Sequence, residues 1–303
     1  MLQDIRAFFV AHQVMEVETP ILARAATSEL HLTSWSASAP GHATVPYFLH
    51  TSPELAMKRL LAAGCGDIYQ ICKVFRADEQ GQRHNPEFSL LEWYRLGFDL
   101  DALMQEVEDL LTSFLQPQLK APAQFRTYRE IFLEYLQCDP LTASTEALIA
   151  CYQQHTDAAA PAQMAHDDWL DLMLSAVIEP RLPRDRLIFI HHYPATQASL
   201  AQLDHQDPRT AKRFEVFFQG LELANGFEEL IDAHEQRQRM QQENQSRLQL
   251  GLPEVVLDER FLAALQAGLP ACSGVALGLD RLLMLMTSKK HIDQVLTFSI
   301  DRV

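Results

Sequence analysis

The chain has 303 residues, of which 48% are hydrophobic and 21% are charged, and this balance is typical of a folded globular protein rather than a disordered or fibrous one. Its 40 Asp and Glu residues outnumber its 25 Lys and Arg residues, so the net charge of −15 argues against a broadly basic nucleic-acid-binding surface. No apolar run reaches the ~18 residues of a membrane span, and the N-terminal segment MLQDIRAFFVAHQ lacks the pattern of a signal peptide. Five scattered cysteines without a CxxC pair argue against a disulfide framework or a structural zinc site and favour a reducing, cytoplasmic location.

The first hundred residues predict helices and strands in alternation. Apolar residues at helical spacing predict a helix over residues 2–13, and a strand-like segment follows and stops at Pro20. Ser52-Pro53 predicts the start of a second helix, with a capping hydroxyl and a proline at the first helical position, and Gly64 is its natural terminator. Residues 68–75 then predict a buried strand.

The segment EFSLLEWYRLGF, which begins at Glu87, alternates as a strand and is followed by an amphipathic helix after Asp99. One face of this strand carries Glu92 and Tyr94 among apolar side chains. A carboxylate and a phenol in such a place suit ligand binding, but an edge strand with one solvated face explains them equally well.

A second strand pair is predicted around Gln219-Gly220, which suits a two-residue hairpin loop. This register places Phe217 opposite Glu222 and Glu215 opposite Ala224, so the two glutamates share a face as diagonal neighbours roughly 7–8 Å apart. Two carboxylates repel unless a cation lies between them, and oxygen ligands of this kind suit Mg²⁺. A solvated hairpin face remains the alternative.

The C-terminal part predicts a very polar helix over residues 232–250 and a short amphipathic helix over residues 258–268. In CSGVALGLDRLLMLM, two glycines, Gly274 and Gly278, precede Asp280-Arg281 and an apolar helix. Glycines allow the backbone to approach a ligand closely, and the arginine offers a fork for phosphate, although most glycines at this spacing serve packing.

Three of these segments together resemble the signature motifs of class II aminoacyl-tRNA synthetases. The first helix with VMEVETPIL is similar to motif 1, FRADEQGQRHNPEFSLLEWY to motif 2 and GVALGLDRLLML to motif 3, while RHNPEF and ANGFEEL narrow the resemblance to the lysyl branch. The resemblance implies an α+β fold, with an antiparallel sheet flanked by helices and a homodimer formed through motif 1. It also implies one catalytic domain over residues 1–303, with a family-variable insertion at about residues 116–212.

Within this family, the chain resembles the lysyl-tRNA synthetase paralogues that ligate (R)-β-lysine to elongation factor P in an ATP-dependent reaction. No anticodon-binding OB domain precedes motif 1, and Ala276 stands where the synthetases have a glycine in motif 3. Because motif 1 begins at about residue 2, we expect a short N-terminal segment to be missing. A minimal lysyl-tRNA synthetase that acts on tRNA and a catalytically dead paralogue are the alternatives; the missing anticodon-binding domain and the net charge argue against tRNA binding.

The resemblance implies a set of ATP and metal contacts. Arg76 matches the motif 2 arginine that bridges the substrate carboxylate and the α-phosphate, and Asp78 stands where the family usually has Glu, with neighbouring Glu79 as the alternative. Glu215 and Glu222 match Mg²⁺ ligands, in agreement with the hairpin. The implied ATP-binding positions are Arg76, Asp78, His84, Asn85, Phe88, Glu222, Leu223, Gly278 and Arg281, with Arg76 and Arg281 as the catalytic residues.

The resemblance also implies a pocket for the two amines of a lysine isomer, because carboxylates pair with ammonium groups. Glu229 and Tyr94 match the side-chain ammonium site, and Glu54 and Glu92 are the expected partners of the second amine. Ala276 adds a methyl group to the pocket floor, which can tune the choice between α- and β-lysine. The implied substrate-binding positions are Ser52, Pro53, Glu54, Glu92, Tyr94, Asn225, Glu229 and Ala276.

Overall fold

A computed structural model of the chain describes residues 1–39, 47–161 and 164–303. The chain divides into two compact units, which we describe separately: unit 1 comprises Met1–Asp99 and Glu229–Val303, and unit 2 comprises Leu100–Glu228. The expected insertion at residues 116–212 falls within unit 2, and its residues 162 and 163 lie outside the described residues. Its boundaries stay a prediction.

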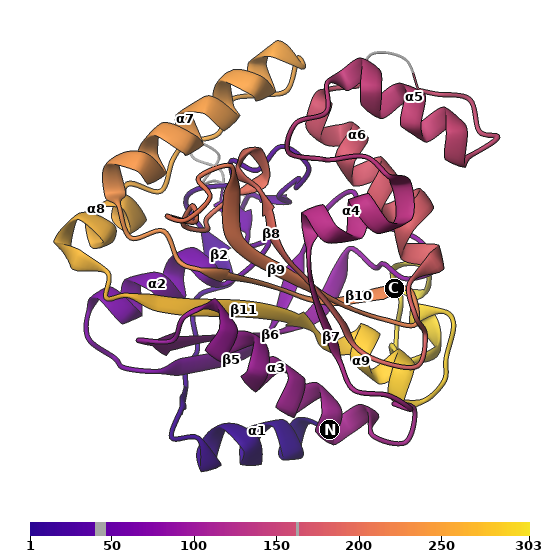
Figure 1. Cartoon of the computed structure of the whole chain (residues 1–303). Coiled ribbons are helices and arrows are strands. Elements are labelled where there is room, and N and C mark those ends of the chain that lie inside the picture. The colour runs from indigo at the N-terminus through magenta and orange to yellow at the C-terminus, as the bar shows by residue number, and fades with distance from the viewer. Residues whose placement is uncertain (40–46, 162–163) are drawn as a thin grey trace. The chain divides into compact units, whose positions relative to one another are not determined.

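Unit 1 combines helices from both ends of the chain with strands from both ends (Figure 1). Its helices are α1 (Leu2–Ala11), α2 (Glu54–Ala62), α7 (Ala233–Gln249), α8 (Glu259–Gly268), α9 (Leu279–Met286), η4 (Ile292–Gln294) and η5 (Ile300–Arg302). Its strands are β1 (Met15–Glu16), β2 (Leu22–Ala23), β3 (Ser36–Ala37), β4 (Tyr47–Leu49), β5 (Ile68–Phe75), β6 (Glu87–Leu96) and β11 (Cys272–Gly278).

The strands of unit 1 that carry the site follow the order β1-β5-β6-β11, and β2, β4 and β3 form a small separate sheet. β1 is parallel to β5, whereas β5 pairs with β6 and β6 pairs with β11 in antiparallel register. Gln70, Glu92 and Ala276 are aligned across the three central strands, so their side chains share one face. The alternation predicted for residues 87–98 therefore holds over β6.

The opposite face of this sheet is covered by α1. The Phe9 ring stacks on Tyr69 with centroids 4.3 Å apart and meets Trp93 edge-on at 5.4 Å. All three side chains are fully buried, and aromatic pairs of this geometry stabilise a core beyond the area that they bury. This packing leaves the face that carries Glu92 and Tyr94 for the site.

Two details of unit 1 differ from the local sequence pattern. Pro53 is the N-cap of α2 rather than its first helical residue, although the Ser52 hydroxyl still accepts a hydrogen bond from the Glu54 amide at 2.9 Å. The strand expected to stop at Pro20 is limited to Met15–Glu16, because only these residues pair with β5. Gly64 has a φ of +86°, which confirms its role in ending the α2 segment.

Unit 2 packs its helices against a second set of strands (Figure 1). Its helices are α3 (Leu100–Leu115), α4 (Tyr128–Leu136), α5 (Thr145–His155), α6 (His166–Met173), η1 (Leu174–Ile178), η2 (Glu179–Arg181) and η3 (Ala195–Gln197). Its strands are β7 (Gln124–Thr127), β8 (Ile188–Pro194), β9 (Thr210–Phe218) and β10 (Leu221–Glu228), in the order β10-β9-β8-β7. The antiparallel strands and flanking helices of the two units confirm the predicted α+β class.

The hairpin of β9 and β10 has the predicted loop. Gln219 and Gly220 have φ values of +54° and +73°, as a type I′ turn requires, and Phe217 pairs with Glu222. The expected pairing of Glu215 with Ala224 is wrong, because a β-bulge between Glu222 and Ala224 shifts the register and places Asn225 opposite Glu215.

The hydrophobic core of unit 2 lies between α4, α6 and the β8–β9 pair. Tyr128, Trp169 and Phe217 are among its fully buried aromatic side chains. α4 begins with a capping box in which Thr127 and Glu130 satisfy each other's backbone amides. Most of the expected insertion thus belongs to a packed core rather than to a linker.

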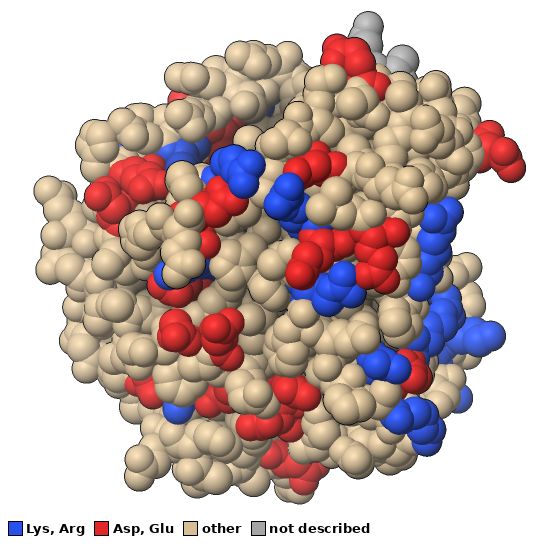
Figure 2. Space-filling model, in the orientation of Figure 1, with Lys and Arg blue, Asp and Glu red and all other residues tan. Residues whose placement is uncertain are grey.

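The structure also bears on the cysteines, on membrane-spanning helices and on the distribution of charge. All five cysteines are free in the structure. Among the described residues, none of the helices combines the length and the apolar character needed to cross a membrane. Figure 2 shows acidic and basic side chains together on one face, so the net charge of −15 does not make the surface uniformly acidic.

Candidate active site

A buried cluster of acidic side chains in unit 1, where the resemblance places the amino-acid pocket, contains Glu92 and Tyr94, which lie on the same face of β6. The Tyr94 hydroxyl donates a hydrogen bond to Glu92 Oε1 at 2.7 Å, and the Ser52 hydroxyl donates one to Glu92 Oε2 at 2.7 Å. Glu92 and Tyr94 are each only 2% exposed. The alternative of a solvated strand face is therefore excluded, because a carboxylate at such a depth needs these donors.

Lys58, on α2, connects two further carboxylates of the pocket. Its Nζ lies 2.6 Å from Glu54 Oε1, one helical turn earlier, and 2.5 Å from Glu229 Oε2, which follows β10 in the chain. Lys58 and Glu229 are each 1% exposed. The pocket thus combines three carboxylates with one ammonium group at short range.

Burial dominates the protonation of these groups. Burial, reinforced by the charge of Glu54, raises the pKa of Glu92 to about 7. Burial also raises the pKa of Glu229 to about 8, although the charge of Lys58 opposes it. Burial acts to lower the pKa of Lys58, but Glu229 and Glu54 outweigh it, so the net shift of that pKa is upward and the ammonium stays charged.

The floor of the pocket is formed by β11. Gly274 lies opposite Tyr94, and a Cβ there would overlap the Tyr94 ring and Glu229 Oε1. Ala276 lies opposite Glu92 in the same register. Gly274 therefore allows close packing of the side chains of Tyr94 and Glu229, and the placement of Ala276 at the pocket floor stays a prediction.

Arg76 follows β5, and its Nε donates to the carbonyl of Thr51, the residue before Ser52, at 3.4 Å. Its Nη1 donates to Glu79 Oε1 at 2.9 Å, and its guanidinium lies over the Phe88 ring, 5.1 Å from the centroid. Glu79 therefore contacts Arg76, whereas Asp78 is exposed at the surface. Arg76 thus contacts both Phe88 and Glu79, while the ATP contacts of these residues stay a prediction.

Motifs 2 and 3 meet where Arg281 contacts His84. Arg281 Nη2 donates to His84 Nε2 at 2.6 Å, so the imidazole accepts through that nitrogen. Arg281 lies in the first turn of α9, whose N-cap is Gly278. Asp280 is buried and accepts a hydrogen bond from the Ser89 amide at 2.6 Å, which ties α9 to β6.

Asn85 connects the motif 2 loop to the C-terminal segment. Its amide nitrogen donates to the Glu87 carbonyl at 2.6 Å, and its Oδ1 accepts from the Ile300 amide at 3.0 Å. Asn85 is 5% exposed. The side-chain amide of Asn85 therefore binds two backbone groups in this structure, and its contact with ATP stays a prediction.

In unit 2, Glu215 is buried beside a cation and a phenol. Arg213 pairs with its Oε1, and the Tyr193 hydroxyl donates to its Oε2 at 2.7 Å. Burial raises the pKa of Glu215; Arg213 opposes this shift and the charge of Glu222 adds to it. Glu222 pairs with Phe217, two residues from Glu215, so the two glutamates lie on the same face of the hairpin, and their role as metal ligands stays a prediction.

This pair fits Mg²⁺, because Mg²⁺ binds one or two carboxylates and completes its shell with water and substrate phosphates. Among the residues that the structure describes, no group of three or more His, Cys, Asp or Glu side chains could hold a metal. Leu223 is buried in the bulge between Glu222 and Ala224, and Asn225 lies opposite Glu215. The Oδ1 of Asn225 is buried without a hydrogen-bond partner among the described residues, as a ligand-facing group would be.

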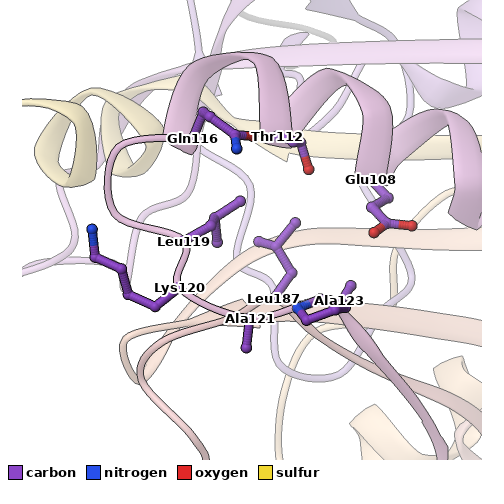
Figure 3. A pocket seen from close by; sticks show the side chains of 9 residues that line it. Glu108, Thr112, Gln116, Leu119, Lys120, Ala121, Ala123 and Leu187 are labelled. Carbon is purple, nitrogen blue, oxygen red and sulfur yellow. The ribbon is translucent and has the colours of Figure 1, made fainter.

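A separate cavity of about 340 Å³ in unit 2 lies along the second half of α3 and the segment after it (Figure 3). Of the residues that line it, Glu108 and Thr112 lie on α3 and Gln116 directly follows this helix. None of the predicted site residues lines this cavity. It is therefore distinct from the candidate site.

A comparison with known families explains the arrangement of these motifs. Residues 1–302 match the family described as tRNA synthetases class II (D, K and N). The chain belongs to this family. The match confirms the resemblance of the three motifs and the fold that it implied, and family membership implies ATP as a substrate.

Curated relatives cover the full chain. Proteins named elongation factor P--(R)-beta-lysine ligase from Klebsiella pneumoniae subsp. pneumoniae and Pseudoalteromonas translucida are 46% and 47% identical to it, over 100% of this chain and 93% and 94% of theirs. The protein of the same name from Salmonella typhi is 45% identical over 100% of this chain and 93% of its own.

The sequence reasoning missed two residues of the site. Lys58 carries a local signal, since it lies four residues after Glu54 on one helix, but its contact with Glu229 depends on the fold. Asp280 was noted only as a neighbour of Arg281, and its bond to the Ser89 amide has no local signature.

Proposed function

We propose that this protein is an ATP-dependent ligase that activates (R)-β-lysine as an adenylate and transfers it to the side-chain amine of a lysine on elongation factor P. The observation that carries the proposal is the charge of the buried pocket. Its three carboxylates, Glu54, Glu92 and Glu229, exceed its one ammonium group, Lys58, by two charges, which suits the two ammonium groups of a lysine isomer. Relatives that are 45%, 46% and 47% identical over the whole of this chain, and whose names state this activity, support the proposal.

The reaction proceeds in two steps. The carboxylate of β-lysine attacks the α-phosphorus of ATP, which forms the acyl-adenylate and releases pyrophosphate. The deprotonated lysine amine of the partner then attacks the acyl carbon, which forms the amide and releases AMP. Such steps depend on positioning and charge stabilisation, so the protein needs no nucleophile of its own.

Arg76 is the residue proposed to bridge the carboxylate and the α-phosphate. A planar guanidinium can hold two oxyanions while negative charge moves between them, and Glu79 and Phe88 orient it. His84 and Arg281 are proposed to contact the terminal phosphates, with Arg281 donating a hydrogen bond to His84 in this structure, and Phe88 offers a ring for adenine to stack on. Asn85, Asp78 or Glu79, Leu223 and Gly278 complete the proposed ATP contacts.

Glu215 and Glu222 are the residues proposed to hold Mg²⁺ with the ATP phosphates. When bound, Mg²⁺ neutralises phosphate charge and stabilises the pyrophosphate leaving group. Glu215 is held in place by Arg213 and Tyr193, so its carboxylate is oriented before the metal arrives.

The amino-acid pocket has two proposed ends. Glu229 and Tyr94 receive the side-chain ammonium, and Glu54 and Glu92 receive the second amine. Ser52 orients Glu92 through its hydroxyl, and Asn225 contributes an amide oxygen. Pro53 and Ala276 shape the pocket wall and floor.

The family also suggests how the protein is assembled. We expect a homodimer formed through the motif 1 segment, α1 with β1, and action in the cytoplasm, where translation factors are modified. The mass of the protein in solution tests the first expectation.

The decisive experiment is label transfer. The protein is incubated with ATP, Mg²⁺ and labelled (R)-β-lysine or α-lysine, with elongation factor P and tRNA offered together. Base-stable label on elongation factor P, stronger with the β-isomer, is expected, because an amide survives mild base. Base-labile label on tRNA would instead identify a minimal synthetase, and no label with either acceptor would contradict the proposal.

A pair of arginine variants tests the assignment of Arg76. Arg76→Gln should lower label transfer about 10²- to 10³-fold, as the loss of one oxyanion donor does. Arg260→Gln removes an exposed guanidinium from α8 and should leave transfer unchanged. Equal rates in the two variants would exclude the proposed role of Arg76.

A further inference from the structure

We infer that Lys58 is a positioning residue that sets the charge of the amino-acid pocket, so that the pocket accepts a substrate with two ammonium groups. This inference rests on the proposed function of the same pocket. Lys58 is placed to hold Glu54 and Glu229 together rather than to touch the reacting atoms, since its Nζ lies 2.6 Å from one carboxylate and 2.5 Å from the other.

The burial of Lys58 makes it a permanent part of the pocket. The side chain is 1% exposed, and an ammonium taken out of water at this depth is stable only while both carboxylates remain beside it. A substrate ammonium group therefore binds while Lys58 stays in place and does not displace it. The substrate meets the two negative charges that Lys58 leaves uncompensated.

The charge count explains a preference for diamines. Without Lys58, the three carboxylates would repel one another more strongly, and the buried ones would hold protons to a higher pH. The charge of Lys58 opposes the rise that burial causes in the pKa of Glu229. Two substrate ammonium groups then complete the neutralisation, whereas an amino acid with one amine leaves a buried charge unpaired.

Other titratable groups that face the pocket are few among the described residues. Tyr94 and Cys272 lie within electrostatic range of the glutamates, and burial raises the pKa of both, so both stay neutral. Cys72, on β5, interacts with Glu92 and is likewise neutral, because burial raises its pKa to about 12. The charged residues of α8, which packs on α2, are exposed. Lys58 and the three glutamates therefore control the charge.

The test compares four proteins by ATP–pyrophosphate exchange from pH 6 to 9: the wild type, Lys58→Met, Lys58→Met/Glu54→Gln and Arg59→Met. In Lys58→Met, the acid limb of kcat/KM for (R)-β-lysine should move up by about one pH unit or more, because the glutamates lose a buried cation. At pH 7 this shift lowers kcat/KM about tenfold or more, mainly through KM, while kcat at saturation stays within about threefold. Arg59→Met removes an exposed cation from the same helix and should leave the profile unchanged.

The double variant separates charge from structure. Lys58→Met/Glu54→Gln removes one charge of each sign, so its acid limb should return toward that of the wild type. A lower rate in Lys58→Met without movement of the acid limb would show a merely structural role and overturn the inference. An acid limb in the double variant that stays displaced would overturn it as well, and this variant decides the question alone if Lys58→Met does not fold.

A substrate comparison completes the test. The wild type should use (R)-β-lysine at least about 100-fold better than (R)-3-aminohexanoic acid, which lacks only the terminal amine, because a buried carboxylate is left unpaired. Glu54→Gln removes one negative charge from the pocket, so this ratio should fall in that variant. An unchanged ratio would contradict the charge count.

Failure of the proposed function is distinguishable from failure of this inference. A wild type that exchanges pyrophosphate with no lysine isomer would contradict the ligase. The role of Lys58 is then tested without substrate, by urea unfolding of the same proteins from pH 5 to 9. Lys58→Met should lose stability more steeply with rising pH than the wild type and the double variant, and equal slopes would overturn the inference.

Discussion

Gly274 on β11 lies directly opposite Tyr94 on β6, and the tyrosine ring occupies the space that a Cβ on residue 274 would need. Glu229 Oε1 borders the same space. Gly274 has no positive φ, so the requirement for glycine arises from close approach alone. The first half of motif 3 thereby shapes the pocket that motif 2 supplies with polar groups.

Substitution of Gly274 by alanine should damage the pocket. The methyl group must displace Tyr94 or Glu229, and overpacking of this kind costs about 1–3 kcal/mol of stability. We expect kcat/KM for β-lysine to fall about 100-fold, because a ~1 Å displacement of positioning groups has effects of this size. Pyrophosphate exchange and thermal unfolding measure the two effects.

Gly278→Ala is the matched control for stability. A Cβ at Gly278 would meet only Arg281 at 3.7 Å, an ordinary contact. Its melting temperature should stay close to that of the wild type. A Gly274→Ala protein with unchanged kinetics would contradict the close approach.

Removal of the Tyr94 hydroxyl should weaken amino-acid binding. Tyr94→Phe deprives Glu92 Oε1 of a donor at 2.7 Å, so the pKa of that carboxyl should rise further and KM for β-lysine should increase about tenfold. Tyr69→Phe is the matched control, since the Tyr69 hydroxyl donates to Glu16 at 3.0 Å on the other face of the sheet. Steady-state exchange kinetics distinguish them, and an equal KM in both would exclude the role of Tyr94.

The activity should depend on pH near neutrality. Burial raises the pKa of Glu92 to about 7 and that of Glu229 to about 8, and only the ionised carboxylates pair with ammonium groups. Thus kcat/KM for β-lysine should fall as the pH is lowered from 8.5 to 6. A kcat/KM that falls only near the ordinary glutamate pKa would contradict this prediction.

The same shifts affect stability with a defined sign. Because the pKa values of these carboxyls are raised by folding, their contribution to the free energy of unfolding is complete below the ordinary glutamate pKa and is lost as the pH rises through 7 to 8. β-Lysine should restore it by pairing with the ionised forms. The rise in melting temperature on adding β-lysine should therefore be larger at pH 8.5 than at pH 6, and equal shifts would refute the linkage.

Ala276→Gly should change the choice between lysine isomers. Ala276 lies opposite Glu92 in the β11–β6 register, so its methyl group borders the expected site of the second amine. Its removal should raise the use of α-lysine relative to β-lysine by about 5- to 100-fold, since one methyl group is worth about 1–3 kcal/mol of discrimination. Unchanged relative kcat/KM values for the two isomers would remove any role for Ala276 in specificity.

The Mg²⁺ site can be tested on the hairpin. Glu215→Gln should raise the Mg²⁺ concentration needed for half-maximal exchange about tenfold, while KM for β-lysine stays unchanged, because a neutral amide is a poor Mg²⁺ ligand. Glu228→Gln, which removes a carboxylate paired with Lys212 at 2.7 Å on the same hairpin, is the control. A Mg²⁺ titration that moves equally in both variants would contradict the assignment.

Local patterns in the chain were enough to predict the family, the element types and the faces of the strands. Alternation with a period of two placed Glu92 and Tyr94 on one face of β6, and Gln219-Gly220 specified the turn of the hairpin, because both depend on local geometry. The motifs added the candidate ATP and amino-acid residues, whose types and order are visible in the chain.

Which of these residues meet depends on contacts between distant parts of the chain. The bulge beside Leu223 changed the partner of Glu215, since one extra residue in a strand has no reliable local signal. The contacts of Lys58 with Glu229 and of Gly274 with Tyr94 join segments far apart in the sequence, so they depend on strand register and helix packing. The charge and shape of the pocket follow from these long-range contacts, whereas the chain alone shows only that acidic side chains are present.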